Sequence, residues 1–368
     1  MIYFDNAASS RPCAEALNAF RAAAENNFAN PSALHDGGIN AEKIITAAGE
    51  KILSKLPQSP NARLIFTSGG TESNNLALLG LYRREKNGKI ITTSIEHPSA
   101  AVPINELEKR GYEVIRLSPA VGESFEEKII AAMDGDVFLI SVMAVNNETG
   151  FVINTPKLYE AVKRKYPDCV MHTDAAQGFL KTPVNGDLIS FSAHKLHGLK
   201  GVGALYIKDL IRLNPLFFGG GQQNGLRPGT EPAELIAAFG AAVESFVYDK
   251  DHFINLTAKL KRLLSDLDCV VYNSRENLPN IINFSVRGIK SEILLHYLAE
   301  NDIYVSSGSA CARGRKSKAL TAFGVSGKDA DSTLRLSFSG ENTTDEIEKF
   351  ASVLKAGAER FSGRKRRN

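Results

Sequence analysis

The sequence predicts an α/β fold, in which a large domain with a mostly parallel sheet is joined to a smaller α+β domain. Between about residues 60 and 210, short β-branched runs alternate with helical patterns, and the strands are apolar almost throughout, as in sheets covered on both faces. After about residue 245 the pattern becomes that of a separate α+β domain. Because 368 residues are too many for one ordinary core, we expect a large domain over 12–247 and a small one over 1–11 and 248–368.

The elements of the two domains can be placed in order along the chain. In the large domain we expect strands at 89–95, 112–118, 137–145, 169–175, 188–193 and 203–208, with helices at 71–86, 98–110 and 155–166. In the small domain we expect helices at 252–267, at 292–301 and from Thr344 onward, with strands at 269–273, 281–286 and 334–339. The chain has no internal repeat and no low-complexity tract, which fits two globular domains.

Composition restricts the classes of function. The chain has 44 Lys and Arg against 41 Asp and Glu, and this net charge of +3 does not support a nucleic-acid-binding surface, so we expect no direct nucleic-acid partner. The four cysteines are far apart and form no CxxC pair, which is typical of neither a disulfide framework nor a zinc ribbon: Cys13, Cys169, Cys269 and Cys311. We see no signal peptide and no apolar run of membrane-spanning length. These features predict a cytoplasmic protein with reduced thiols and no membrane association.

The stretch FTSGGTESNN, residues 66–75, has the features of a phosphate site. A predicted strand ends, Gly70 and the glycine before it permit a tight turn, and Thr71 opens a helix. Backbone N–H groups at a helix start, beside a hydroxyl, suit an anion. An ordinary strand-to-helix turn with a Thr cap has the same pattern, and the stretch is neither a Walker loop nor a GxGxxG fingerprint. Alone, it does not choose between these interpretations.

Two further chemical groups follow apolar strands in the same domain. Asp174 of VMHTDAAQ could pair with a protonated ring nitrogen, and Gln177 could reach a neighbouring oxygen. Lys195 of SFSAHKLHG is a candidate Schiff-base amine, because desolvation lowers the pKa of a lysine and makes it nucleophilic. A helix cap and a surface lysine are the simpler alternatives. His194 and His197 could suit a metal, but no carboxylate or thiol nearby completes the set, so we expect no metal site.

Taken in order along one domain, these pieces match the needs of pyridoxal 5'-phosphate. That cofactor requires an anchored phosphate, a lysine imine and an acid that keeps its pyridine nitrogen protonated. With the nitrogen protonated, the ring accepts electrons from the α-carbon of the substrate. The ordered set therefore predicts this cofactor, which no single motif does.

Long motifs spread over nearly the whole chain carry a family resemblance: YFDNAASS, NPSALHDGG, FTSGGTESNNLAL, EHPSA, NNETG, HTDAAQ, SFSAHKLHG, GGGQQNGLRPGT, SSGSAC and LRLSFS. With these motifs the sequence resembles the cysteine desulfurases of the NifS-like branch of the class V aminotransferases. The resemblance implies the fold type I of pyridoxal-phosphate-dependent transferases. It also implies conversion of L-cysteine to L-alanine, with the sulfur passed to an enzyme cysteine as a persulfide.

The resemblance also implies the roles of the cofactor residues. Lys195 would hold the cofactor as an imine, Asp174 would bind the pyridine nitrogen, and Gln177 the phenolic oxygen. His97 of EHPSA would stack on the ring and assist proton transfer. The phosphate would be bound by residues of the tight turn and of the lysine motif: Gly70, Thr71, Ser192 and His194. Thr230 of RPGT would reach it from a second subunit, which implies a homodimer.

For the substrate, the resemblance assigns Asn147 of NNETG and Arg335 of LRLS to the carboxylate, a task that suits the fork of an arginine. Cys311 of GSACARGRKSK would be the nucleophile that attacks the sulfur of cysteine. It must act as a thiolate, which nearby cations favour: Arg313, Arg315, Lys316 and Lys318. The sulfur would then pass to an acceptor protein, with iron–sulfur clusters, thiolated tRNA and thiamine precursors all compatible destinations.

Other functions stay open from the sequence. A selenocysteine lyase or a cysteine β-eliminase would use the same cofactor, and the elimination would give pyruvate and ammonia instead of alanine. A non-catalytic sulfur-trafficking or scaffold protein would be expected to lack a cofactor residue, whereas all of them are present. The identity of the products separates desulfuration from elimination.

Overall fold

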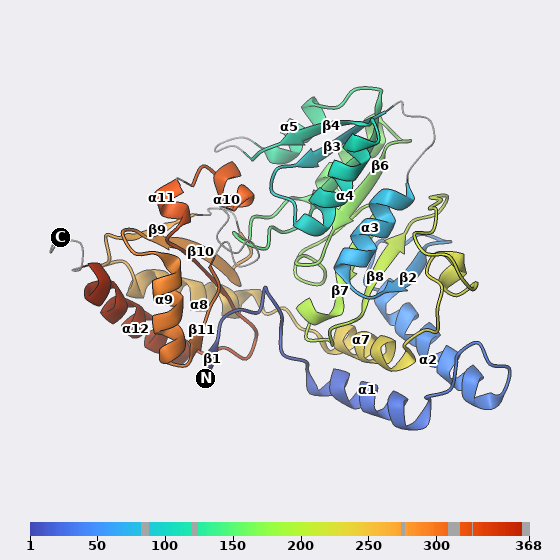
Figure 1. Ribbon diagram of the computed structural model, residues 1–368, viewed down its shortest axis with the longest axis horizontal. Helices are drawn as coiled ribbons and strands as arrows, with labels where there is room; N and C mark the ends of the chain where they lie inside the picture. Colours follow the sequence, from blue (N-terminus) through green and yellow to red (C-terminus); the bar gives the residue numbers. More distant parts are fainter. Residues whose placement is uncertain (82–87, 120–123, 274–276, 308–316, 326, 363–368) are drawn as a thin grey trace.

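The computed structural model describes residues 1–81, 88–119, 124–273, 277–307, 317–325 and 327–362, which form two lobes (Figure 1). The larger lobe holds a seven-stranded sheet in the order β2-β8-β7-β6-β5-β3-β4. Its strands are β2 (Arg63–Thr67), β3 (Lys89–Thr93), β4 (Glu113–Leu117), β5 (Val137–Met143), β6 (Val170–Asp174), β7 (Leu188–Ser192) and β8 (Gly203–Ile207). Strand β8 is antiparallel to both its neighbours, and the other pairs are parallel. The predicted mostly parallel sheet is confirmed.

Helices cover both faces of this sheet. Successive residues of a strand point to opposite sides, and here the residues on both sides are apolar and must be buried. The helices of the lobe are α1 (Ala14–Asn26), α2 (Asp36–Leu53), α3 (Gly70–Gly80), α4 (Pro98–Lys109), α5 (Phe125–Ala131), α6 (Thr155–Lys165) and α7 (Ala233–Ser245), with the 3₁₀ turns η1 (Ala193–Lys195) and η2 (Gln223–Gly225). Ile90 of β3 packs with α3 and α4, whereas the next residue, Ile91, packs with α5 and α6 on the other face. On that second face, α2 and α7 cover β7 and β8.

The smaller lobe contains an antiparallel sheet, in the order β12-β10-β9, and a parallel pair, β1 with β11. Its elements are β1 (Ile2–Tyr3), α8 (Lys250–Leu263), β9 (Val270–Tyr272), β10 (Ile281–Val286), α9 (Ser291–Glu300), β11 (Ile303–Tyr304), α10 (Lys318–Ala322), α11 (Gly327–Ala330), β12 (Thr333–Ser337) and α12 (Thr344–Ser362). The first residues of the chain belong to its core, where the ring of Phe4 meets that of Phe338 edge-on at 5.2 Å. Ile2 and Phe4 therefore pack with the smaller lobe, and the division into residues 12–247 and residues 1–11 with 248–368 stays a proposal.

Several elements differ from the sequence-based expectation. The helix expected at 71–86 begins at Gly70 and ends at Gly80, where the backbone N–H of Asn214 donates to the Gly80 carbonyl at 2.9 Å and satisfies the end of the helix. Residues 82–87 lie outside the described ranges. The pattern did not predict α2 or α7. Among the described helices, none combines the length and the apolar character needed to cross a bilayer.

Candidate active site

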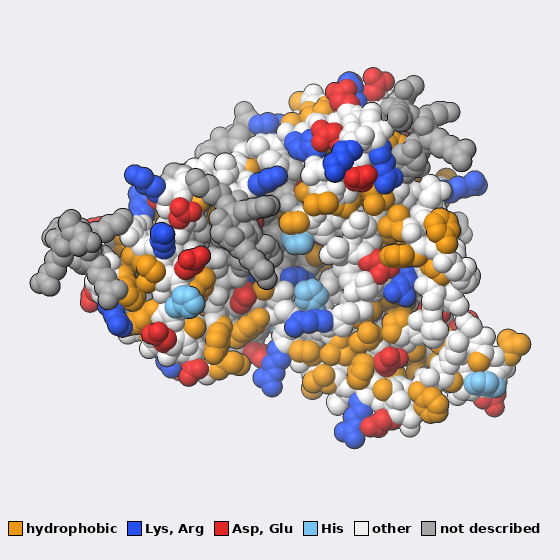
Figure 2. All heavy atoms as spheres, viewed as in Figure 1, with side chains coloured by type: hydrophobic (Ala, Val, Ile, Leu, Met, Phe, Trp, Pro, Cys, Tyr) orange, Lys and Arg blue, Asp and Glu red, His pale blue; other side chains and the backbone are white. Residues whose placement is uncertain are grey.

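The carboxyl ends of the parallel strands bring the predicted polar residues to one edge of the large sheet. Asp174 is the last residue of β6 and Ser192 the last of β7, and both are buried. His97 directly precedes α4, and Asn147 follows β5. This edge faces the smaller lobe, and Figure 2 shows histidine side chains and basic side chains, of lysine or arginine, in the hollow between the two lobes. Such an edge is where α/β proteins bind their ligands.

A chain of hydrogen bonds links Asp174 to His97, and we call its four members the Asp174 network. Asn74 of α3 donates from Nδ2 to Asp174 Oδ2 at 2.7 Å and to Ser99 Oγ at 2.8 Å. Ser99 Oγ in turn lies 2.7 Å from His97 Nδ1. The other carboxylate oxygen of Asp174 accepts the backbone N–H of Ala176 at 3.0 Å. The carboxylate is therefore held in place by protein donors.

The position of the proton on His97 follows from this network. The backbone N–H of Ser99 donates to Nδ1 at 3.1 Å, so Nδ1 is an acceptor and a neutral ring carries its proton at Nε2. Burial lowers the pKa of His97 below its ordinary value; the Asp174 carboxylate opposes this and Lys195 adds to it. The ring is thus favoured in its neutral form with a defined tautomer.

Lys195 follows β7 through the turn η1, and its amine is held by the N-terminal segment of the chain. Nζ donates to the carbonyl of Ala7 at 2.6 Å and to that of Ala8 at 2.7 Å. Gln177 Nε2 donates to the same Ala7 carbonyl at 2.7 Å. The structure therefore brings Gln177 and Lys195, two of the predicted cofactor residues, to one backbone oxygen.

The tight turn before α3 is built by close backbone approach. A Cβ on Gly203 would lie 2.6 Å from the Cα of Gly69, so β8 and the turn can meet only without side chains there. Gly69 has φ +152°, which disfavours other residues. A Cβ on Gly70 would lie 3.7 Å from that of Ser192. The start of α3 and the end of β7 therefore lie side by side, as a phosphate site between them requires.

We call Gly70, Thr71, Ser192 and His194 the anion cradle, and its polar atoms are a test of whether a phosphate fits. Ser192 Oγ and His194 Nδ1 are buried and have no hydrogen-bond partner among the described residues. Burial lowers the pKa of His194 to about 4, and three lysines contribute: Lys195, Lys200 and Lys181. Gln177 Oε1 is buried and also has no partner within the described ranges. Buried polar atoms are rarely left unpaired, so these positions fit a bound polar group such as pyridoxal phosphate.

Arg335 lies on β12 of the smaller lobe and reaches across to the larger one. Its Nη1 donates to the backbone carbonyl of Asn147 at 2.9 Å, and its Nη2 lies 2.6 Å from Asp5 Oδ1. Its buried Nε has no partner among the described residues. The structure thus brings Asn147 and Arg335 together, as expected of residues that share one substrate group, although the contact is made by the backbone of Asn147.

Two predicted residues are not brought to this edge by described contacts. Thr230 is exposed on the surface after η2. Cys311 lies outside the described residues, as do Arg313, Arg315 and Lys316 of the same motif. Lys318 is described and is the first residue of α10.

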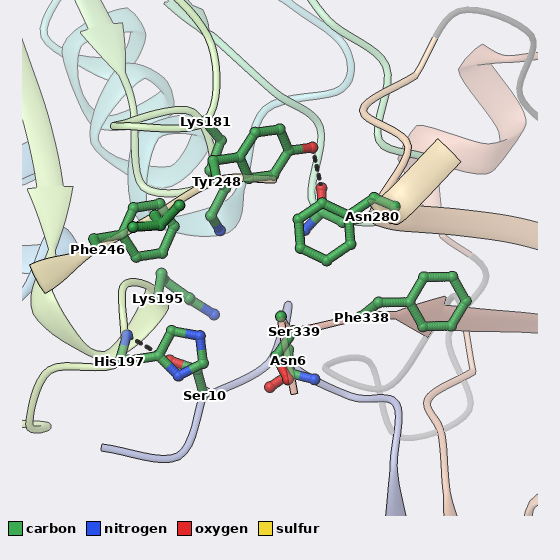
Figure 3. A pocket seen from close by; sticks show the side chains of 13 residues that line it. Asn6, Ser10, Lys181, Lys195, His197, Phe246, Tyr248, Asn280, Phe338 and Ser339 are labelled. Carbon is green, nitrogen blue, oxygen red and sulfur yellow. Dashed lines mark hydrogen bonds between the residues drawn. The ribbon is translucent and has the colours of Figure 1, made fainter. Parts of the chain in front are cut away.

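Sequence reasoning missed several residues at the site. Lys181 and Lys195 point into one cavity of about 20 Å³ between the lobes (Figure 3), and burial with the nearby Lys195 lowers the pKa of Lys181 to about 7. Glu96, directly before His97, has its pKa raised by burial to about 8. Asn74 and the carbonyl of Ala7 were missed too, although both lie inside motifs that carry the resemblance. Their positions in FTSGGTESNN and YFDNAASS were the one feature of the sequence that could have indicated a place at the site.

Comparison with known proteins gives consistent relatives over the whole chain. Residues 2–350 match the family described as aminotransferase class-V. The chain is 36% identical to a NifS/IcsS protein homolog of Lactobacillus delbrueckii subsp. bulgaricus, over 98% of each chain, and 36% identical to cysteine desulfurase IscS of Clostridium botulinum, over 96% of this chain and 93% of the other. Among solved structures, a NifS-like protein superposes with a TM-score of 0.87 at 32% identity, covering 98% and 99% of the two chains. SspA in complex with cysteine superposes with a TM-score of 0.78 at 32% identity, covering 92% and 99%.

Proposed function

Because this chain belongs to the class V aminotransferase family, we propose that it is a cysteine desulfurase that uses pyridoxal 5'-phosphate. It converts L-cysteine to L-alanine and collects the sulfur on Cys311 as a persulfide, which an acceptor protein then takes. Membership of the family confirms the resemblance and the fold type that the sequence motifs implied. Solved relatives include one whose description names bound cysteine, which supports the same substrate for this chain.

The attachment of the Cys311 segment is the observation that carries this proposal. Ser306 and Arg335 exchange two backbone hydrogen bonds, of 3.2 and 2.7 Å. Cys311 follows Ser306 by five residues, so covalent geometry limits the distance between their Cα atoms to about 18 Å. The thiol is therefore tethered to the residue that we propose to bind the substrate carboxylate.

The residues of the site have complementary tasks. Bound pyridoxal phosphate supplies an electron sink that weakens the carbon–sulfur bond of cysteine. Asp174, fixed by Asn74, offers a carboxylate for the ring nitrogen, and the anion cradle binds the phosphate. His97 holds a proton at Nε2, and Arg335 offers its unpaired Nε to the substrate carboxylate.

The sulfur transfer itself balances without a further oxidant. The Cys311 thiolate attacks the sulfur of cysteine, a sulfur–sulfur bond forms, and the carbon–sulfur bond breaks. The electron pair of the broken bond stays with the substrate carbon, which takes up a proton and becomes the methyl group of alanine. The acceptor protein, or an added thiol reductant, removes the outer sulfur and restores the thiolate.

We also propose a homodimer, in which Thr230 of one copy completes the anion cradle of the other. A groove of about 510 Å³ lies beside the start of α3, lined by residues that include Phe217, Phe218 and Arg227. Phe218 is 90% exposed in the single chain, and an exposed aromatic pair favours burial against a second copy. A cytoplasmic location and supply of sulfur to iron–sulfur clusters or thiolation enzymes complete the proposal, supported by the relatives named IscS.

Substitution of the proposed nucleophile tests this function. In the holoenzyme supplied with L-cysteine and a thiol reductant, Cys311→Ala should keep the absorbance of the bound cofactor and lose alanine and sulfide production. Cys269→Ala is the matched control, because it removes a half-buried thiol of the smaller lobe and should leave both products unchanged. Full alanine production by Cys311→Ala would overturn the persulfide role, and pyruvate in place of alanine would assign the enzyme to β-elimination.

A further inference from the structure

The first described residue after the 308–316 segment is bonded to the loop that carries Asn147. Ser317 Oγ donates to Glu148 Oε2 at 2.6 Å. Glu148 directly follows Asn147, whose carbonyl accepts from Arg335. The segment that contains Cys311 is therefore attached near Arg335 on both sides. Ser306, before the segment, is bonded to the Arg335 backbone. Ser317, after it, is bonded to Glu148, the neighbour of Asn147.

Glu148 is fixed independently of Ser317. Its backbone N–H donates to Asn146 Oδ1 at 3.1 Å, and its carbonyl accepts from Asn283 Nδ2 of β10 at 3.2 Å. Asn146 is buried and its Nδ2 donates to the carbonyl of Ile95 at 3.0 Å. The carboxyl group of Glu148 thus projects from a turn that is bonded to both lobes, which makes it a rigid point of attachment.

Ser317 makes a second contact that fixes α10. Its Oγ accepts the backbone N–H of Leu320 at 3.0 Å and so caps the helix. Ala319 of α10 packs in a core with Ile95 and Met143, two residues of the larger lobe beside the Asp174 network. The end of the Cys311 segment is therefore held on the larger lobe, while its beginning is held on the smaller lobe through Arg335.

We infer that Glu148 is a positioning residue, which through Ser317 fixes the end of the Cys311 segment beside the substrate carboxylate site. This inference rests on the proposed function of Cys311. A carboxylate at this place does not touch the reacting atoms. It restricts the region that the thiol can reach. A small error in the position of a reacting group lowers the rate of the reaction more than it lowers the affinity for the substrate.

The test compares three variants of the holoenzyme in single-turnover reactions with L-cysteine. Glu148→Ala removes the acceptor for Ser317, and we expect the rate of persulfide formation on Cys311, followed by mass spectrometry, to fall about tenfold or more. The KM for cysteine should change less than threefold or so, because the Arg335 contact to the Asn147 backbone remains. Glu148→Gln keeps an amide oxygen in the same place and should restore the rate to within a few-fold of the unmodified protein.

Ser317→Ala reports on the same bond from the other side and keeps the test valid if Glu148→Ala does not fold. It should slow persulfide formation, and in combination with Glu148→Ala it should add little. Ser124→Ala is the matched control, since Ser124 also caps a helix, α5, and also donates to a glutamate, Glu126. It should leave the rate unchanged.

Each outcome has one meaning. Equal rates for Glu148→Ala and the unmodified protein would overturn the positioning role, and so would a slow Glu148→Gln variant or a rate loss in Ser124→Ala of the same size. If the unmodified protein forms no persulfide on Cys311, the proposed function fails and takes this inference with it.

Discussion

The two sides of the proposed cofactor site differ in how many of their polar side chains are hydrogen-bonded within the protein. In the Asp174 network, three hydrogen bonds link four side chains from β6, α3 and the start of α4. In the anion cradle, Ser192 Oγ and His194 Nδ1 are buried with no partner among the described residues. The side chains of the first side are held by one another, whereas those of the second would gain partners from a bound phosphate. Changes on the first side should therefore affect the reaction, and changes on the second the affinity for the cofactor.

The largest expected effect is on the reaction, from the loss of His97. We expect His97→Ala to lower kcat about 10²- to 10⁴-fold, the usual contribution of a positioned acid or base, with the cofactor still bound. Ser99→Ala should cost less, because it removes the contact that orients the ring and leaves the ring in place. Steady-state kinetics and cofactor absorbance check both. Loss of the cofactor from His97→Ala would break the comparison between the two sides.

A smaller effect is expected on the cradle side, from the loss of Ser192. Ser192→Ala should weaken binding of pyridoxal phosphate about 10- to 100-fold, because one hydrogen bond to a charged group is lost. The same change should leave the unfolding free energy of the cofactor-free protein unchanged or higher, since it removes a buried hydroxyl that has no partner in the part of the chain that the structure describes. Cofactor titration and chemical denaturation measure the two quantities.

Ser190, two residues earlier on β7, is the matched control for Ser192. Its Oγ lies 3.0 Å from His172 Nε2 in the buried sheet. Ser190→Ala should therefore lower the stability of the cofactor-free protein by about 1–3 kcal/mol and leave cofactor affinity unchanged. If Ser192→Ala and Ser190→Ala changed cofactor affinity and unfolding free energy alike, the proposed role of Ser192 in phosphate binding would be contradicted.

A separate effect concerns Glu96, beside the Asp174 network, and it is seen in the pH dependence of the stability and not in the reaction or in cofactor affinity. Burial raises the pKa of Glu96 to about 8, whereas in the unfolded chain it titrates near 4.5. Between these values the folded state binds the extra proton, so the free energy of unfolding should fall as pH rises, by up to about 1.4 kcal/mol per pH unit. Glu96→Gln keeps an acceptor for Thr93 and for the Met143 N–H, and should remove this dependence. Denaturation from pH 5 to about 9 checks this; an equal slope in both proteins would contradict it.

The sequence was informative about residues that end strands and poor about residues that connect segments. Asp174 and Lys195 could be predicted because each follows an apolar strand, and a parallel sheet brings such positions together. Asn74 could not be predicted as a partner of Asp174, because that contact joins positions 100 residues apart and depends on how α3 crosses the sheet. For the same reason, no local pattern links Ala7 to Lys195 or Ser317 to Glu148. The helices α2 and α7 were missed although they cover β7 and β8.

The N-terminal segment gives the two cations of the site a common support. Asp5 contacts Arg335, and two residues later the carbonyl of Ala7 accepts from Lys195, while Ala7 N donates to Ser337 Oγ of β12 at 2.8 Å. The amine of Lys195 and the guanidinium of Arg335 therefore share one short stretch of backbone, and a displacement of that stretch would change the surroundings of both groups.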